Sequence, residues 1–188
     1  MPNSNSIRFL TWNLNMMNHS AQAPMGWRID QTESLIRQRV LETKADVVCF
    51  QELPAMVPFV ETHDLAPANT ISHNGTVATI VRKDLMGQIV CRAIGRFAVV
   101  CVFQKLDLTV ANVHLEPTKG GAEKRLQQLV KLIDICPTKS LLIAGDTNSR
   151  IAEEDNFAAI GLAGQRPPSP TWDSRRNQHA TKSKSRAF

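Results

Sequence analysis

The chain has 188 residues, of which 43% are hydrophobic and 21% are charged, and its formal net charge is +5. This composition is typical of a globular protein with a single core and excludes a disordered chain. No apolar stretch could cross a bilayer and the start, MPNSNSIRFLTW, has no signal-peptide core, so we expect a cytoplasmic protein, or a nuclear one in a eukaryote, without membrane insertion.

The excess of positive charge lies at the end of the sequence. Residues 174–188 contain five of the 22 basic residues and no acidic residue, which leaves 17 basic residues against 17 acidic ones in residues 1–173. The sequence therefore predicts one domain over 1–173 and a basic tail over 174–188. Such a tail either contacts phosphate groups or is a solvated, mobile end.

Apolar runs rich in Val, Ile, Phe and Thr predict seven strands. They cover residues 7–14, 45–52, 76–83, 88–94, 97–104, 108–115 and 140–145. Two helices are predicted, one that begins at Asp30 and carries Ile36, Val40 and Leu41 on one side, and one over residues 122–135. Because crossover helices occur together with consecutive strands, the pattern indicates an α/β chain in which sheets pack together with helices outside.

The last predicted strand is followed directly by polar residues. Leu141 to Ala144 show no alternation with polar residues, which predicts a strand buried on both faces. Gly145, Asp146 and Asn148 come next, and these residue types favour turns. Taken alone, the stretch LLIAGDTNSR is either a strand with an ordinary turn or a strand that delivers polar side chains to a site.

Three other apolar runs also finish on polar residues that can bind metals or move protons. The runs RFLTWN, VVCFQE and VANVH end at Asn13, Glu52 and His114, and the fourth run is followed by Asp146 and Asn148. If these ends share one rim of the fold, they combine two carboxylates, two carboxamides and one imidazole. Such a set is rich in hard oxygen ligands, which favours Mg²⁺ or Mn²⁺ over Zn²⁺.

The ordered motifs TWN, QE, NVH and GDTN resemble those of the endonuclease/exonuclease/phosphatase superfamily, which includes exonuclease III, pancreatic DNase, deadenylases and inositol polyphosphate phosphatases. The resemblance covers residues 7–173 in the expected order and spacing. It implies a four-layer αββα sandwich made of two packed mixed sheets with outer helices. It also implies a metal-dependent phosphodiester hydrolase, with Mg²⁺ or Mn²⁺ as the cofactor and nucleic acid as the expected substrate.

The resemblance further implies a role for each residue at the strand ends. Glu52 would hold the metal with help from Asn13, and Asp146 would orient or deprotonate the attacking water. Asn148 would hold the phosphate, while His114 would stabilise charge on the phosphate oxygens in the transition state. For each residue alone the alternative is structural: a solvated charge, a turn residue or a buried histidine.

Two further features are similar to those of 5′-tyrosyl-DNA phosphodiesterases, which release protein from DNA 5′ ends and so belong to DNA repair. These features are Arg150, two positions after Asn148, and the sequence PTWDS, which contains Trp172 and Asp173. Arg150 would contact a phosphate, with a surface ion pair as the alternative. Trp172 would stack on a base or an aromatic leaving group, with a place in the core as the alternative.

One part of the family pattern does not occur in the 188 residues. The family normally closes with a strand and a Ser-Asp-His run, which is absent here. We therefore expect a fold without its final strands, an intact metal-binding half of the site and an impaired acid-base half. Two alternatives stay open: a catalytically inactive module that binds phosphate or DNA, and a phosphoesterase acting on phosphoinositide or sphingomyelin headgroups.

The cysteines and the remaining histidines indicate no further site. Four cysteines stand separately in or beside apolar segments without a CxxC pair, which predicts reduced core thiols rather than disulfides or a zinc site. They are Cys49, Cys91, Cys101 and Cys136. The other histidines match no motif and are predicted to lie at the surface; they are His19, His63, His73 and His179.

Overall fold

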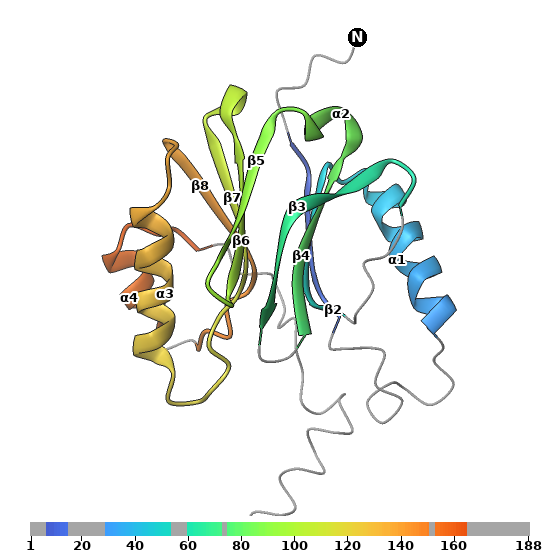
Figure 1. Cartoon of the computed structure of the whole chain (residues 1–188). Coiled ribbons are helices and arrows are strands. Elements are labelled where there is room, and N and C mark those ends of the chain that lie inside the picture. The colour runs from blue at the N-terminus through green and yellow to red at the C-terminus, as the bar shows by residue number, and fades with distance from the viewer. Residues whose placement is uncertain (1–6, 15–28, 54–59, 73–74, 151–152, 165–188) are drawn as a thin grey trace, which may run out of the picture. The chain divides into compact units, whose positions relative to one another are not determined.

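The structure, a computed structural model, describes residues 7–14, 29–53, 60–72, 75–150 and 153–164 (Figure 1). The chain divides into two compact units, Met1–Arg150 and Ile151–Phe188. In the second unit the described residues include helix α4, Glu154–Ala159. All other helices and strands named below belong to the first unit. The predicted tail and the predicted domain end at residue 173 lie outside the described residues.

The first sheet has the strand order β1-β2-β4-β3. Its strands are Phe9–Asn13 (β1), Val47–Leu53 (β2), Gly75–Arg82 (β4) and His63–Ser72 (β3). β1 and β2 are parallel, whereas β4 pairs antiparallel with both β2 and β3. Helix α1, Ile29–Thr43, connects the two parallel strands and lies on the outer side of this sheet (Figure 1).

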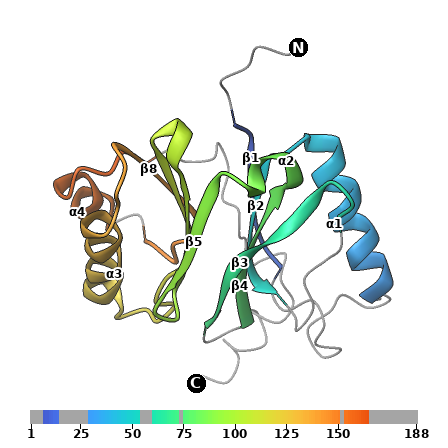
Figure 2. The same ribbon diagram turned by 45° about the horizontal axis from the view of Figure 1, so that its top comes forward.

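The second sheet has the strand order β5-β6-β7-β8. Its strands are Ile89–Ile94 (β5), Ala98–Phe103 (β6), Leu108–His114 (β7) and Ser140–Asp146 (β8). β5, β6 and β7 form antiparallel pairs, while β7 and β8 are parallel and are connected by the outer helix α3, Ala122–Asp134 (Figure 2). Short turns of helix, Lys83–Met86 (α2) and Gln104–Leu106 (η1), join further strands. Within the described parts of the chain, no helix has the length and apolar character that a membrane span needs.

Alternation along β2 explains how one strand contributes to two apolar layers. Val48 and Phe50 pack in one cluster with Ile36 of α1, whereas Val47 and Cys49 belong to the cluster between the two sheets. Both sets of side chains are fully buried because successive residues of a strand point to opposite faces. The order of helix, sheet, sheet and helix confirms the predicted αββα sandwich.

Strand β3 was not among the predicted strands. Its sequence, HDLAPANTIS, contains Pro67, which cannot donate a backbone hydrogen bond to a neighbouring strand. The register of β3 against β4 shifts between Leu65 and Asn69, around this proline, and within the described sheet β3 is a terminal strand. Proline is tolerated at such positions, so a segment whose composition is typical of a loop can still form a strand.

Predictions of burial were wrong at several positions. Leu41 of α1 is 43% exposed, and Cys91 and Cys136 are half-buried rather than core thiols.

The burial of β8 and of His63 also differs from the prediction. Strand β8 is half-buried rather than fully buried, and in the described sheet it pairs on one side only, with β7. His63 is only 7% exposed, and its ring nitrogens lie 2.9 Å from the carbonyl oxygen of Ala45 and 2.9 Å from the hydroxyl of Thr62. A histidine with two local polar partners can be buried at moderate cost.

Candidate functional site

Parallel pairing places the polar strand ends at one rim of the sandwich. In the first sheet Asn13 pairs with Gln51, the residue before Glu52. In the second sheet His114 pairs with Asp146. Because parallel strands have their carboxyl ends at the same edge, each sheet presents two polar ends together. The two edges then meet, because the side chain of Asn13 in the first sheet is hydrogen-bonded to that of Asp146 in the second.

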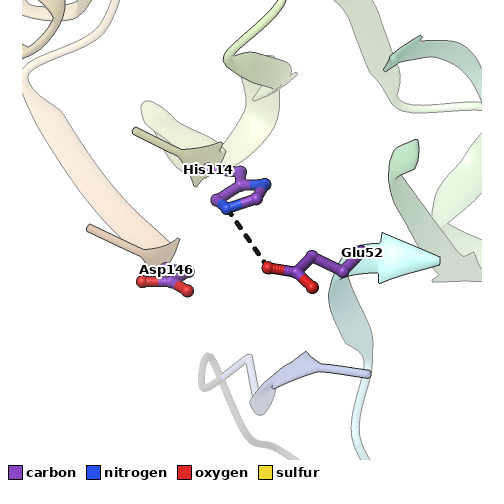
Figure 3. A group of neighbouring side chains, drawn as sticks. All are labelled: Glu52, His114 and Asp146. Atoms are coloured by element: carbon purple, nitrogen blue, oxygen red, sulfur yellow. Dashed lines mark ion pairs between the residues drawn. The ribbon is translucent and has the colours of Figure 1, made fainter. Parts of the chain in front are cut away.

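Glu52, His114 and Asp146 form a compact group of two carboxylates and one imidazole (Figure 3). One ligand atom from each residue lies within 4.8 Å of the others. His114 Nε2 is 3.5 Å from Glu52 Oε1, and the two side chains are only 2% and 12% exposed. With His114 buried and the two carboxylates partly exposed, the group matches the chemistry of a divalent cation that prefers oxygen ligands.

Two amide groups hold the carboxylates in this group. The side-chain nitrogen of Asn13 donates to Asp146 Oδ2 at 2.8 Å and to Glu52 Oε1 at 3.2 Å. The backbone N–H of Asn148 donates to the other oxygen, Asp146 Oδ1, at 2.9 Å. Both oxygens of Asp146 are therefore oriented, while each keeps lone-pair capacity for a further partner.

Glu52 reaches the group through an irregularity of β2. Its φ is +52°, and the register of β2 against β4 shifts between Phe50 and Leu53. A bulge of this kind redirects a side chain at the end of a strand, and a left-handed conformation is unfavourable for glutamate. The local strain thus coincides with the residue that the sequence singles out as a metal ligand.

A buried network of two amide side chains joins the sheets directly behind the site. Asn112 of β7 donates to the carbonyl oxygens of Phe50 (3.2 Å) and Ala78 (2.8 Å) in the first sheet, and Gln51 of β2 donates to Asn112 Oδ1 at 2.7 Å. Asn112 is 0% exposed and Gln51 1%. Gln51 precedes Glu52, and Asn112 lies two residues before His114, on the same face of β7. The network therefore fixes the separation of the carboxylate from the imidazole.

Sequence reasoning did not recognise Gln51 and Asn112 as part of the site. A signal was present, because each is a polar residue inside an otherwise apolar strand and within two positions of a singled-out residue. Apart from the carbonyl oxygen of Cys49, which lies in the same strand as Gln51, their partners lie on other strands, between 33 and 62 positions away. Such partners become visible only when the packing of the two sheets is known.

Gly145 and Asn148 shape the backbone at the end of β8, Gly145 within the strand and Asn148 just after it. Gly145 has a φ of +128°, and a Cβ atom there would lie 2.2 Å from the carbonyl oxygen of Val113. Only glycine allows β7 and β8 to approach this closely. Asn148 has a φ of +49°, and its side-chain nitrogen donates to the carbonyl oxygen of Leu115 at 3.1 Å. The strand runs one residue further than predicted, to Asp146, and the Asp146 side chain accepts the backbone N–H of Asn148 where the chain leaves the strand.

A cavity of about 230 Å³ adjoins His114. Arg96, Glu116 and Lys124 contribute charged side chains to its lining. Lys124 forms an ion pair with Glu116, and this hydrogen-bonded ammonium lowers the pKa of the Glu116 carboxyl to about 2. Glu116 is therefore ionised at neutral pH, and its charge is compensated by Lys124.

The remaining predicted residues do not join this group. Arg150 is exposed, and among the described residues no hydrogen bond or ion pair connects it to Glu52, His114 or Asp146. Trp172 lies outside the described residues. The structure brings together Asn13, Glu52, His114 and Asp146, with Asn148 held against Asp146 through the backbone.

Comparisons with known proteins agree with this architecture. D. rerio TDP2 complexed with single strand DNA product is 20% identical, with a TM-score of 0.55 over 84% of this chain and 66% of that chain. The endonuclease domain of TRAS1, a telomere-specific non-LTR retrotransposon, is 20% identical, with a TM-score of 0.60 over 91% of this chain and 80% of that one. A Bacteroides thetaiotaomicron mannosyl-6-phosphatase is 15% identical, with a TM-score of 0.57 over 83% and 71%.

The sequence itself gives a family assignment. No curated protein matches the chain. The model of the Endonuclease/Exonuclease/phosphatase family, however, matches residues 10–183, which include all four polar strand ends. At this level of identity the solved structures establish the fold, and the family model extends over most of the sequence. The chain belongs to the endonuclease/exonuclease/phosphatase family of hydrolases that act on phosphoesters.

Proposed function

We propose that the chain is a divalent-metal-dependent phosphodiester hydrolase that acts on nucleic acid. The observation that carries the proposal is the convergence of Asn13, Glu52, His114 and Asp146 from the ends of four strands. The similarity to TDP2 bound to a DNA product and to the TRAS1 endonuclease domain supports nucleic acid as the substrate class. We propose Mg²⁺ as the cofactor, with Mn²⁺ as a substitute, because most of the donor atoms are hard oxygens.

The donor groups divide into a metal-binding part and a part that handles water and phosphate. Glu52 would hold the metal, and Asn13 would fix the Glu52 carboxylate through its 3.2 Å hydrogen bond. When bound, the metal would neutralise charge that gathers on the phosphate oxygens and on the leaving oxygen. The group consists of carboxylates and an imidazole, which can activate water, so the attacking nucleophile would be water.

Asp146 is placed to orient that water. Its two oxygens are held by Asn13 and by the backbone of Asn148, so its remaining lone pairs point in defined directions. The carboxylate would accept a proton from water as the oxygen attacks phosphorus in line with the leaving oxygen. The side chain of Asn148 would hold a phosphate oxygen, and Arg150 would contact a neighbouring phosphate.

His114 would donate a hydrogen bond to the phosphate oxygens from the opposite sheet. It is 4% exposed and lies beside the Glu52 carboxylate, in surroundings where a donor stabilises charge more strongly than in water. The buried amides of Gln51 and Asn112 would keep this donor at a fixed distance from the metal-binding carboxylate.

Within this chemistry we propose a 5′-tyrosyl-DNA linkage as the preferred substrate, and hence a role in DNA repair. The sequence GDTNSR with Arg150, the PTWDS motif with Trp172 and the similarity to TDP2 support this choice. A phenolate is a weaker base than an alkoxide, so its departure needs less assistance from an acid. Because a mannosyl-6-phosphatase is among the similar structures, other phosphoesters should be tested together with the tyrosyl substrate.

A substrate panel tests the proposal. A 5′-tyrosyl oligonucleotide, an abasic duplex, poly(A) and soluble phosphoinositide and sphingomyelin headgroups are incubated with Mg²⁺ and the wild type, Asp146→Asn or the exposed control Asp64→Asn. We expect the tyrosyl oligonucleotide to be cleaved fastest, and Asp146→Asn to lose about 100-fold or more in kcat. Equal turnover by wild type and Asp146→Asn would rule out the proposed site.

The same panel separates the alternatives. If only a headgroup substrate were turned over, the chain would instead be a hydrolase of lipid phosphoesters. Salt-dependent DNA binding without any turnover would instead identify a module that only binds, since contacts to phosphates weaken as the salt concentration rises.

A further inference from the structure

Cys91 and Cys101 are direct partners across the β5–β6 hairpin. They are ten positions apart in the sequence, and the antiparallel register pairs them residue to residue. Their Sγ atoms are 2.9 Å apart. Directly opposite residues of antiparallel strands have Cα atoms about 4.5–5.5 Å apart, which lies within the range that a disulfide spans. Only the side chains would have to move for the two sulfurs to bond.

The two thiols differ in access and in acidity. Cys91 is half-buried on β5, a terminal strand of the described sheet, whereas Cys101 is 1% exposed between the sheets. The hydrogen bond with Cys101 lowers the pKa of the Cys91 thiol, while the same bond and burial raise the pKa of the Cys101 thiol. Cys91 is thus the more accessible and the more acidic of the two thiols, which are the properties that favour reaction with an oxidant.

We propose that Cys91 and Cys101 form a redox-active pair, in which Cys91 is the accessible nucleophile and Cys101 resolves the intermediate into an intramolecular disulfide. This site is separate from the carboxylate–imidazole group and independent of the proposed hydrolase function. The sequence gives no sign of this pair, because the two cysteines are ten positions apart and only the β5–β6 hairpin brings them together.

The oxidant class is a small disulfide such as oxidised glutathione. The Cys91 thiolate attacks one sulfur of the oxidant, a bond forms between these sulfurs, and one molecule of reduced thiol leaves. The Cys101 thiol then loses its proton and attacks the Cys91 sulfur, which expels the second thiol. Two cysteine thiols are oxidised and one small disulfide is reduced to two thiols, so atoms and electrons balance.

The other cysteines provide matched controls. Cys136 is also half-buried, and hydrogen bonds to Thr109 and Thr138 outweigh its burial and lower the pKa of its thiol. It differs from Cys91 in having threonine rather than cysteine as its neighbour. Cys49 is fully buried, and burial raises the pKa of its thiol to about 12, so it serves as an inert control.

The experiment treats the full chain with oxidised glutathione, blocks free thiols by alkylation, digests it with trypsin and measures peptide masses. Trypsin cleaves after Arg92 and Arg96, so a Cys91–Cys101 bond appears as two peptides joined together. We expect these joined peptides, two hydrogen atoms lighter than the sum of the reduced peptides, in the wild type. Cys136 should carry glutathione, and Cys49 should stay free until the chain is unfolded.

Two variants test the order of events. In Cys101→Ser, Cys91 should retain glutathione, because no neighbouring thiol removes it. In Cys91→Ser, Cys101 should stay unmodified, because it is buried. The proposal is overturned if wild-type Cys91 retains glutathione to the same extent as in Cys101→Ser. The proposal is equally overturned if Cys91 stays a free thiol at an oxidant concentration that modifies Cys136. This comparison uses the wild type alone, so it does not depend on how the variants fold.

Discussion

Asn148 combines a strained backbone with a side chain that the proposed mechanism uses. Its φ of +49° is tolerated by asparagine and glycine but costs other residues about 1–2 kcal/mol. We predict that Asn148→Ala is less stable than Asn148→Gly by roughly this amount, measured as the free energy of unfolding in urea. The glycine variant accepts the backbone conformation, whereas alanine does not.

The same two variants separate backbone from side chain in the activity. Both lack the amide that bonds to the Leu115 carbonyl and that would hold the phosphate. We therefore expect both to raise KM for the substrate to a similar extent. If Asn148→Gly retained wild-type kinetics while Asn148→Ala did not, the backbone rather than the amide would be the functional element.

His63 predicts a pH dependence of stability. Burial lowers the pKa of His63 from its ordinary value of 6.5, so the unfolded chain binds a proton at a higher pH than the folded chain. Stability is therefore complete above pH 6.5 and falls as the pH drops from there towards the folded-state pKa. Thermal unfolding between roughly pH 7.5 and pH 5.5 should show a steeper loss of Tm for the wild type than for His63→Gln. Parallel curves would show that the titration of His63 does not contribute.

At the residue scale the sequence singles out the residues that the structure brings together, but not the contacts that hold them. Asn13, Glu52, His114 and Asp146 each end an apolar run, which is visible in the sequence. The left-handed conformation of Glu52 leaves no such trace, because it depends on a bulge between paired strands. The roles proposed for these residues remain predictions until the kinetic tests are done.

At the scale of strands, Asn112 is the residue on which the joining of the sheets most depends. Its side-chain nitrogen donates hydrogen bonds to two carbonyl groups of the first sheet, and its side-chain oxygen accepts one from Gln51. Asn112→Ala would remove the donor of the two buried carbonyl groups, at about 1–3 kcal/mol for each, whereas Gln51 keeps its hydrogen bonds to Cys49 and Thr11. We predict a loss of at least about 2 kcal/mol in the free energy of unfolding, measured by urea denaturation.

The control for this variant is Asn69→Ala on β3. Asn69 is exposed, so its side chain should contribute within about 0.5 kcal/mol. A loss in Asn112→Ala no larger than in Asn69→Ala would mean that water or side-chain movement replaces the network. In that case the separation of Glu52 from His114 would be maintained by the apolar core alone.

Strands and helices with a clear periodicity were predicted within one or two residues of their observed ends. The strand predicted over 45–52 is β2, Val47–Leu53, and the helix predicted over 122–135 is α3, Ala122–Asp134. β3 was missed because Pro67 and its polar neighbours are typical of loops. The half-buried state of β8 was missed because its apolar sequence is the same whether or not neighbouring elements cover it.

At the scale of the molecule, the site depends on how two sheets face each other. Glu52 comes from the first sheet and His114 and Asp146 from the second, and each carboxylate accepts a hydrogen bond from Asn13. The sequence predicted this shared rim through its resemblance to a family, since spacing within strands cannot bring separate sheets together. Two nearby carboxylates repel each other, and a divalent cation held by Glu52 would offset that repulsion.

Metal removal is the most direct test of whether this shared rim is a metal-dependent phosphodiesterase site. The metal is removed with EDTA, Mg²⁺ is returned, and cleavage of a thymidine p-nitrophenyl phosphodiester is followed for the wild type, Glu52→Gln and Glu33→Gln. Glu33 is an exposed glutamate of α1 and controls for the loss of one negative charge.

We predict that the wild type and Glu33→Gln lose activity in EDTA and regain it with Mg²⁺, while Glu52→Gln stays about 100-fold or more slower with the metal present. Activity that persists in EDTA, or equal rates for Glu52→Gln and Glu33→Gln, would contradict the account.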